Sequence, residues 1–397
     1  MVRQLWEQNT DVVLVDTGNS YEGLCDYVNG KYISYTEEHP ITMNPFAIKR
    51  EELNIEKIGF LKNLIMLIWK GTNGKITKTE DHLIEDVITE YYDAHFRTGV
   101  VKSLSFNTFY EYSTKRIPEI VKENNLEGID LATYNYLLKD FYKGGNHEVT
   151  LNENLDTALF DETFIVFEID SIKDDPLLFP LVTLIIMDVF IQKMRIKKNR
   201  KVLVIEEAWK AIASPMMAEY IKYLYKTARK FWASVGVVTQ EIQDIVGSPI
   251  VKEAIINNSD VIMLLDQSKF KERFDEIKAI LGLTDVDCRK IFTINRLENK
   301  EGRSFFREVF IRRGQNAAVF GVEEPHECYM TYTTERAEKE ALKLYKRELK
   351  CSHQQAIEAY CRDWDRSGIS KSLPFAQKVN QAGHVLNLQQ NKKNFNS

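Results

Sequence analysis

This 397-residue sequence has few residues that break or cross-link a chain: 18 glycines, 9 prolines and five cysteines. The cysteines form no CxxC pair and are odd in number, so we expect reduced thiols rather than a disulfide framework or a zinc site. Apolar residues make up 44% of the chain, which excludes wholesale disorder. A net charge of −5 excludes a globally basic protein that coats nucleic acid.

Long hydrophobic runs and several catalytic motifs are absent as well. The longest apolar run, LLFPLVTLIIMDVFI, contains Pro180 and Asp188. It is shorter than the roughly 20 apolar residues that span a bilayer, so we expect a buried helix. No signal peptide is visible. The sequence has no HExxH, GxSxG or GxGxxG motif, and its seven histidines show no ligand spacing.

The alternation of strand and helix patterns predicts an α/β fold with a mostly parallel sheet covered by helices on both faces. Short apolar runs rich in β-branched residues indicate buried strands. We expect strands at 12–15, 31–35, 163–170, 201–205, 233–238 and 260–265, followed by antiparallel strands at 304–312 and 316–322.

Four segments are expected along the chain. Residues 1–49 and 161–333 form two parts of one α/β domain. Residues 50–160, a succession of helical patterns punctuated by glycine, form an all-α insertion between them. Residues 334–397 form a charged helical tail, and we expect mobility beyond Ser367, where apolar anchors are few.

Two adjacent carboxylates provide the strongest functional signal. The run Val202–Ile205 predicts a buried strand, and Glu206 and Glu207 follow at its tip, where α/β proteins bind ligands. This pattern is typical of a Walker B segment, in which the first acid holds Mg²⁺ and the second orients or deprotonates the attacking water. The alternative is a strand that simply ends in solvated acids.

Gln240 follows at the tip of the next expected strand, and a basic pair precedes that strand. An amide at a strand tip can bond a γ-phosphate or its attacking water, although Gln240 can also cap the following helix. Acid pair and amide at successive tips together favour nucleotide hydrolysis. Arg229 and Lys230 end a helix, where cations are ordinary partners of the helix dipole. In ring-shaped ATPases a basic residue there can reach the neighbouring subunit's γ-phosphate.

Other polar positions carry weaker signals. Asp16, at the end of the first strand, can support a nucleotide site or start a turn, and we interpret Asp170 as a turn residue. Arg312 and Arg313 are a second basic candidate, with a solvated strand edge as the simpler interpretation. The basic stretch Lys193–Lys201 can meet DNA phosphates in a translocase, but a solvated helix terminus is the simpler interpretation.

Together, four segments resemble a known family: VLVIEEAWKAI, TARKFWASVGVVTQEIQDI, VVLVDTGNSY and the MNPF turn. They are similar to the conjugation ATPases of type IV secretion systems, most of all the TraG type of conjugative transposons, related to the VirB-type and TraC-type ATPases. The resemblance covers roughly residues 1–335. It implies a RecA-like P-loop motor with an all-α insertion, ATP and Mg²⁺ as cofactors, and homo-hexamers. It also implies other secretion subunits as partners, at the cytoplasmic face of the bacterial inner membrane, in service of pilus assembly and substrate transfer.

The resemblance also implies residue roles. Glu206 takes the Mg²⁺ position and Glu207 that of the catalytic glutamate. Gln240 takes the position of the γ-phosphate sensor, and Arg229 with Lys230 that of the inter-subunit basic motif. Glu206 departs from the usual aspartate, whose shorter side chain suits direct metal contact better.

A phosphate loop of the form GxxxxGK[ST] is absent from the sequence. The simplest interpretation is a carboxy-terminal motor fragment that begins just after this loop and by itself turns over little ATP. Two hypotheses stay open beside it. One is a catalytically silent scaffold subunit of the secretion machinery, and the other is a DNA translocase of the FtsK or HerA kind.

Overall fold

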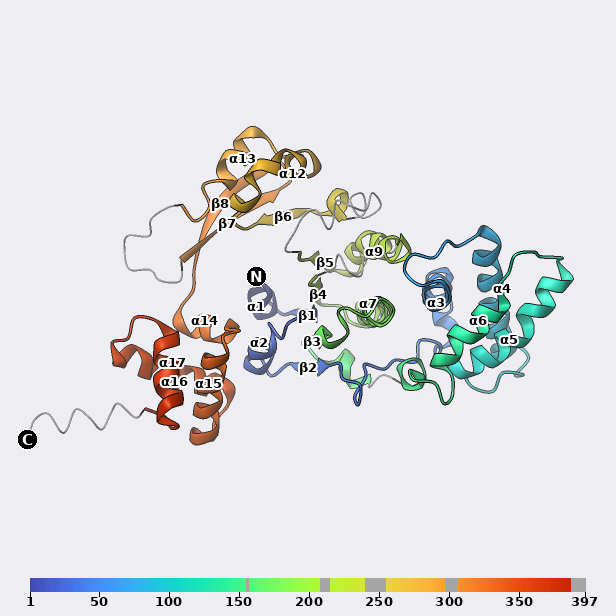
Figure 1. Ribbon diagram of the computed structural model, residues 1–397, viewed down its shortest axis with the longest axis horizontal. Coiled ribbons are helices and arrows are strands. Elements are labelled where there is room, and N and C mark those ends of the chain that lie inside the picture. Colours follow the sequence, from blue (N-terminus) through green and yellow to red (C-terminus); the bar gives the residue numbers. More distant parts are fainter. Residues whose placement is uncertain (155–156, 208–214, 240–254, 297–305, 387–397) are drawn as a thin grey trace, which may run out of the picture. The chain divides into compact units, whose positions relative to one another are not determined.

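The computed structural model describes residues 1–154, 157–207, 215–239, 255–296 and 306–386. The chain forms two compact units, each with its own sheet, whose elements are labelled in Figure 1. The first unit is Met1–Gly18 with Ile33–Asn258, and the second is Asn19–Tyr32 with Ser259–Ser397.

A five-stranded sheet in the order β2-β3-β1-β4-β5 forms the centre of the first unit. β1 is parallel to β3 and to β4, and β5 is parallel to β4. β1 and β3 are buried along their whole length, as the continuous apolar runs predict. The strands expected in this region are confirmed, with the bounds β1 Thr10–Asp16, β2 Lys31–Ser34, β3 Phe164–Glu168, β4 Arg200–Ile205 and β5 Ala233–Val237.

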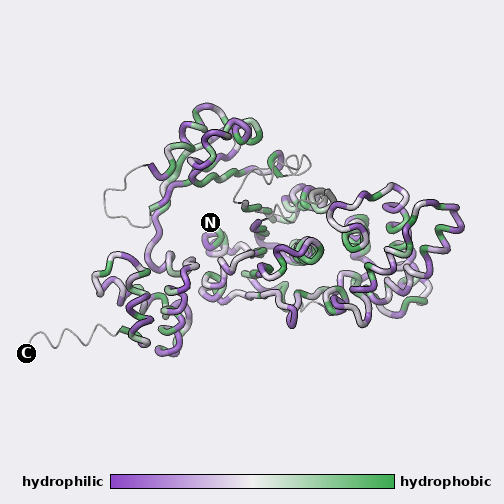
Figure 2. Tube along the Cα trace, in the orientation of Figure 1, coloured by the Kyte–Doolittle hydropathy of each residue, from purple (hydrophilic) through white to green (hydrophobic). Residues whose placement is uncertain are grey.

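Helices cover both faces of this sheet. α1 (Val2–Glu7) lies on one side, and α7 (Leu178–Ile196) and α9 (Pro215–Ala228) lie on the other (Figure 1). α7 carries the longest apolar run and is almost entirely buried, and Figure 2 shows its hydrophobic character. It is a core helix, and no helix among the described residues is long and apolar enough to cross a membrane. The predicted fold class, α/β with a parallel central sheet, is confirmed.

Between β2 and β3 the described chain is helical and contains no strand. Capping boxes define two of the helix starts: Thr77 exchanges hydrogen bonds with Glu80, and Ser105 does so with Thr108. The apolar faces of these helices join the same hydrophobic core as the sheet. The bounds are α3 Ile55–Lys70, α4 Lys78–Phe96, α5 Phe106–Glu123 and α6 Leu131–Leu138.

A buried ion pair links α3 to α7. Nζ of Lys57 lies 2.8 Å from Oδ2 of Asp188, and Gln192 Nε2 donates to the same oxygen over 2.8 Å. The Lys57 ammonium also lies 4.6 Å from the ring centre of Phe60. Asp188, which interrupts the apolar run of α7, is therefore neutralised by its partners.

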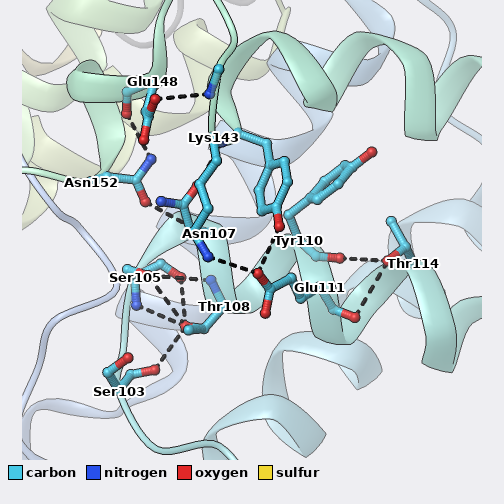
Figure 3. Close-up of polar contacts among 12 residues, drawn as sticks. Ser103, Ser105, Asn107, Thr108, Tyr110, Glu111, Thr114, Lys143, Glu148 and Asn152 are labelled. Atoms are coloured by element: carbon cyan, nitrogen blue, oxygen red, sulfur yellow. Dashed lines mark hydrogen bonds and ion pairs between the residues drawn. The ribbon is translucent and has the colours of Figure 1, made fainter.

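Polar contacts fasten the segment after α6 to α5 (Figure 3). Oε1 of Glu111 accepts hydrogen bonds from the Tyr142 hydroxyl over 2.7 Å and from Lys143 Nζ over 3.0 Å. The backbone N–H of Asn107 donates to Oδ1 of Asn152 over 2.8 Å. The chain that returns towards β3 is thus held against the helices.

The sheet of the second unit is antiparallel, in the order β6-β7-β8. The pairing of β7 with β8 confirms the two antiparallel strands expected from the sequence. β6, expected in the parallel sheet, instead pairs antiparallel with β7, because an apolar run specifies a strand but not its partner. The bounds are β6 Val261–Leu264, β7 Phe306–Arg313, β8 Asn316–Glu323, α12 Phe274–Leu281 and α13 Asp285–Ile291.

Helices at the end of the described chain share a separate core, against which α2 (Glu22–Tyr27) packs. The mobility expected beyond Ser367 is wrong for α17. Phe375, Ala376 and Val379 recur at helical spacing, and all three are buried in this core. The bounds are α14 His326–Tyr332, α15 Arg336–Leu349, α16 His353–Ser367 and α17 Ser372–Ala382.

Candidate functional site

The parallel strands of the first unit end in register along one side of the sheet, which we call the carboxyl edge. Asp16, the last residue of β1, is paired with Glu168, the last residue of β3. Val15 pairs with Ile205 at the end of β4, and Ile205 pairs with Val237 at the end of β5. Open α/β sheets bind ligands at this edge, so residues that end or follow these strands form the candidate site.

Glu206 and Glu207 follow β4 at the carboxyl edge, where the sequence predicts them. The N–H of Glu206 donates to the carbonyl oxygen of Val15 over 3.0 Å. The ladder between β4 and β1 therefore continues one residue past β4 and fixes the Glu206 backbone beside β1. Both glutamates are half-buried, so their carboxylates combine a rigid attachment with access to solvent.

Glu207 has a left-handed backbone, with φ at 48°. A side chain larger than glycine's disfavours this conformation by about 1–2 kcal/mol. Residues held in such strain cluster at functional sites, where the surrounding structure imposes a geometry that the chain would not choose. The turn after β4 thus sends the second acid away from the strand direction, a feature that the sequence does not reveal.

Asp16 and Glu168, the last residues of β1 and β3, are buried beside the candidate site. Asp16 is fully buried, which fits a supporting role better than direct contact with a ligand from solvent. Glu168 is also buried, and its Oε1 accepts hydrogen bonds from the N–H groups of Asp170, over 2.8 Å, and Gly18, over 3.4 Å. Gly18 has φ at 135°, a conformation that favours glycine. Glu168 therefore holds the turn that leaves β1.

Sequence reasoning missed Glu168, although a signal was available. The segment FIVFEID has one acid inside an otherwise apolar run, and buried acids need hydrogen-bond donors. Asp170, the residue considered instead, begins the 3₁₀ turn Asp170–Ile172 and pairs with Lys173 over 2.9 Å. Its interpretation as a turn residue is confirmed.

Arg229 and Lys230 lie where the parallel strands begin, at the opposite end of the strands from the two glutamates. They belong to a 3₁₀ turn, Arg229–Phe231, directly before β5, and both are exposed. Ala233, at the start of β5, pairs with Lys201 near the start of β4. From this pair to the carboxyl edge is four residue steps of about 3.3 Å, or about 13 Å. The structure therefore does not bring this basic pair to the acid pair of the same chain.

The basic stretch Lys193–Lys201 is buried at its two ends and exposed between them. Lys193 is fully buried, and its Nζ lies 2.9 Å from Oδ2 of Asp11. Lys201 is buried too, and its Nζ donates to the carbonyl oxygens of Asn199, over 2.6 Å, and Phe231, over 3.0 Å. Burial lowers the pKa of the Lys201 ammonium.

Two further cations of this stretch form ion pairs, Arg195 with Glu56 and Lys197 with Asp161. Only Lys198 and Arg200 of its six basic residues are exposed and without an ion pair within the described part of the chain. The interpretation as a solvated terminus therefore agrees with the exposed middle of the stretch and is wrong for its buried ends, Lys193 and Lys201.

Three further candidates are Gln240, Arg312 and Arg313. Gln240 falls outside the described residues. Arg312 and Arg313 belong to β7 of the second unit, where Arg312 Nη1 donates to the carbonyl oxygen of Gly282 over 2.9 Å.

The carboxylates at the carboxyl edge fit Mg²⁺ only as part of the ion's ligand set. Carboxylate oxygens suit this ion. Among the described residues, however, no group of three or more acidic, histidine or cysteine side chains is placed to hold a metal ion by itself. Glu206 is a candidate for one ligand, and the remaining ligands of a bound ion would come from outside these side chains.

Comparison with known proteins identifies a family and a relative that match this chain. The family model "TraG P-loop domain" matches residues 1–364. Protein TraC of Escherichia coli (strain K12) is 22% identical over 288 residues, which cover 70% of this chain but only 31% of TraC. The chain therefore spans about a third of this relative's length.

One solved structure shows a similar fold, and a second gives a weaker match. VirB4 of Thermoanaerobacter pseudethanolicus matches with a TM-score of 0.59 and 20% identity, over 82% of this chain and 84% of that one. The plasmid coupling protein TrwB, in complex with ADP and Mg²⁺, matches with a TM-score of 0.49 and 11% identity, over 81% and 79%.

Proposed function

The chain belongs to the TraG P-loop domain family, and on this basis we propose that it is the motor portion of an ATPase that serves conjugative transfer through a type IV secretion system. The observation that carries the proposal is the acid pair Glu206–Glu207 at the tip of β4, in register with Asp16 and Glu168 at the ends of the neighbouring strands. A buried strand with this tip is the part of a P-loop motor that handles metal and water.

Each acid has a separate role in this proposal. Glu206 holds Mg²⁺, directly or through water, and the bound ion neutralises charge on the phosphates. Glu207, whose left-handed backbone diverts it from the strand, orients the attacking water and accepts its proton. Asp16 and Glu168 keep the neighbouring turn in place, and Gln240 senses the γ-phosphate.

The phosphate loop of this site comes, in this proposal, from residues beyond the 397 of this chain. The chain contains no GxxxxGK[ST] segment, whose backbone N–H groups and lysine would cradle the phosphates. We therefore expect the isolated chain to bind ATP weakly and to hydrolyse it slowly. The intact protein, with its phosphate loop, should bind and hydrolyse ATP.

Arg229 and Lys230 act between subunits in this proposal. Because about 13 Å of sheet separates them from the acid pair of their own chain, they can reach a γ-phosphate only in a neighbouring subunit. We propose that this contact forms in a ring of subunits, a homo-hexamer. We place it at the cytoplasmic face of the inner membrane, in contact with other secretion subunits.

The test is Glu207→Gln in the intact protein. We expect ATP binding to persist and turnover to fall by about 10²-fold or more, because the amide cannot take the proton of the attacking water. Glu153→Gln, a change at an exposed acid outside the site, is the matched control and should leave both unchanged. An equal loss of binding and turnover, or unchanged turnover, would contradict the assignment.

One observation favours nucleic-acid translocation as a second candidate. The N–H of Lys201 donates to the carbonyl oxygen of Trp232 over 3.1 Å, so the exposed Arg200 lies near the exposed Trp232, which directly precedes β5. Lys198 is a second exposed cation two residues before Arg200. Cations beside an exposed aromatic side chain suit single-stranded nucleic acid. DNA-stimulated ATPase activity of the intact protein, lost on replacing both cations with alanine, would support this role. Activity that DNA does not change would exclude it.

A further inference from the structure

One face of the antiparallel sheet β6-β7-β8 is covered by α12 and α13 (Figure 1). Phe310, in the middle strand β7, is fully buried there. The Lys290 ammonium of α13 donates to the carbonyl oxygen of Ala317 in β8 over 2.7 Å. Oε2 of Glu308 accepts a hydrogen bond from the N–H of Asn295 over 2.7 Å. These contacts belong to the second unit itself, and we call this side of the sheet the covered face.

The other face of the sheet carries exposed apolar side chains. Phe310 pairs with Leu264 and Val319 across the sheet, and successive side chains of a strand point to opposite faces. Residues an odd number of steps from these three therefore point to the other side, which we call the open face. Its most exposed apolar side chains are Val261 at 42%, Met263 at 46%, Leu265 at 68%, Phe320 at 50% and Val322 at 42%. Antiparallel sheets with a solvated face place polar residues there, so a contiguous apolar patch marks an interaction site.

The charged side chains on the open face are all positive within the three strands. Arg307 and Arg313 lie three residues before and after Phe310 in β7, so both point to the open face. Both are exposed, and neither forms an ion pair within the described part of the chain. The acids of the three strands, Glu308 and Glu323, alternate onto the covered face. A partner of the open face therefore meets cations and needs anions to complement them.

The spacing of the two arginines sets the length of such a partner. Six residue steps separate Arg307 from Arg313, and at about 3.4 Å per step they lie about 20 Å apart along β7. Between them the face is apolar, with Ile311 paired to Met263. An α-helix rises 1.5 Å per residue, so a helix along β7 spans this distance with about 14 residues.

We propose that the open face binds an amphipathic α-helix of another protein, about 14 residues long, whose apolar stripe is flanked by carboxylates at both ends. The apolar stripe would cover Met263 and Phe320, and the carboxylates would pair with Arg307 and Arg313. The helices α15, α16 and α17 of the second unit already bury their apolar faces in a core of their own, so they do not supply this helix.

The charges of the open face argue against other kinds of partner. Two copies of this face would bring only cations together, which disfavours self-association. Nucleic acid is bound by many cations that neutralise phosphates, whereas this face has two arginines around an apolar centre. An apolar centre with a few charged residues at its rim is instead the composition of a protein–protein interface.

A synthetic peptide of the proposed length tests the inference. The peptide has leucines at helical spacing, glutamates in its first and last turns, and a cross-link on its polar face, because helices this short are marginal in water. We expect saturable binding to the 397-residue chain, measured by fluorescence anisotropy. A matched peptide with lysines in place of the glutamates should bind at least about 10-fold more weakly. No saturable binding of the glutamate peptide, or equal binding of both peptides, would overturn the inference.

Three variants of the chain give a second readout. Arg313→Glu should weaken binding of the glutamate peptide at least about 10-fold and strengthen binding of the lysine peptide. Phe320→Ser should weaken binding of both peptides. Tyr136→Ser, which removes an exposed aromatic side chain of α6, is the matched control and should change neither. All three side chains are exposed, so the unfolding midpoint should stay within about 2 °C of the parent. Unchanged peptide binding in Arg313→Glu or in Phe320→Ser would overturn the inference.

Three further outcomes would assign the open face to a different occupant and overturn the inference. Dimerisation of the chain in sedimentation experiments, abolished by Phe320→Ser, would assign the face to a second copy. Co-sedimentation with phosphatidylglycerol vesicles, abolished by the same change, would assign it to a lipid surface. Resistance of Met263 to oxidation by peroxide in the free chain would show that the chain itself covers the face.

Discussion

The carboxylate of Glu168 accepts a hydrogen bond from the N–H of Gly18, 3.4 Å away, so the end of β3 holds the turn that leaves β1. The same oxygen accepts from the N–H of Asp170 over 2.8 Å. One buried acid thereby joins two loops at the carboxyl edge of the sheet. The shape of this edge depends on a residue that need not touch any ligand.

Glu168→Ala should lower the free energy of unfolding by about 1–3 kcal/mol, because the N–H groups of Gly18 and Asp170 lose their shared acceptor. Glu168→Gln keeps an acceptor oxygen and should cost less. Urea unfolding followed by circular dichroism measures both, with exposed Glu153→Ala as the control. A Glu168→Ala protein as stable as this control would show that the two hydrogen bonds contribute nothing.

Glu207→Gly should raise the free energy of unfolding by about 0.5–1 kcal/mol, since glycine adopts the left-handed backbone of this position without strain. The same change should abolish ATP turnover in the intact protein. Glu206→Gly is the matched control: its backbone is not left-handed, so glycine there should destabilise the chain. Equal stability losses in the two variants, measured by urea unfolding, would refute the strain at Glu207.

Lys193→Met and Lys198→Met test the two faces of the basic stretch. Lys193→Met leaves the buried carboxylate of Asp11 without its cation and should cost about 3–5 kcal/mol. Lys198 is exposed, and its replacement should change stability by no more than about 0.5 kcal/mol. Denaturant unfolding distinguishes them, and similar small effects would mean that Lys193 is not buried in solution.

Glu80 should make stability depend on pH in the acid range. Burial raises the pKa of its carboxyl, but hydrogen bonds from Lys70 and Thr77 outweigh burial, and the net pKa lies below its usual value. The contribution is therefore complete above the unfolded-state pKa of about 4.3 and is lost as pH falls through the lower folded-state value. Glu80→Gln should unfold more easily at pH 7 and lose less stability between about pH 5 and pH 3. Parallel pH profiles for variant and parent, measured by urea unfolding, would contradict this.

Much of the fold could be predicted because local patterns carry it. The runs Val12–Val15 and Val202–Ile205 are strands because continuous β-branched and apolar residues suit a sheet covered on both faces. The helical character of the segment between β2 and β3 follows from periodic apolar residues and polar caps. The acid pair after β4 could be located in the same way, since a strand tip is a local feature.

Other features could not be predicted because they depend on partners distant in sequence. The apolar face of α17 is short, and the helix is stabilised by the core that it forms with α15 and α16. β6 reads as a strand, but its antiparallel pairing with β7 is a choice between partners. Lys193 looks like one cation among six until the fold places Asp11 beside it.

The sequence by itself determined the α/β class, the strands of the parallel sheet, the position of Glu206 and Glu207 at a strand tip, and the lack of a phosphate loop. These are properties of short segments, and burial and periodicity act on short segments. Only the tertiary structure decided that Arg229 lies at the opposite end of the strands from the acids, that Glu168 supports the β1 turn, and that β5 is an edge strand among the described residues. Register and burial between distant segments set these three relationships, and no single segment encodes them.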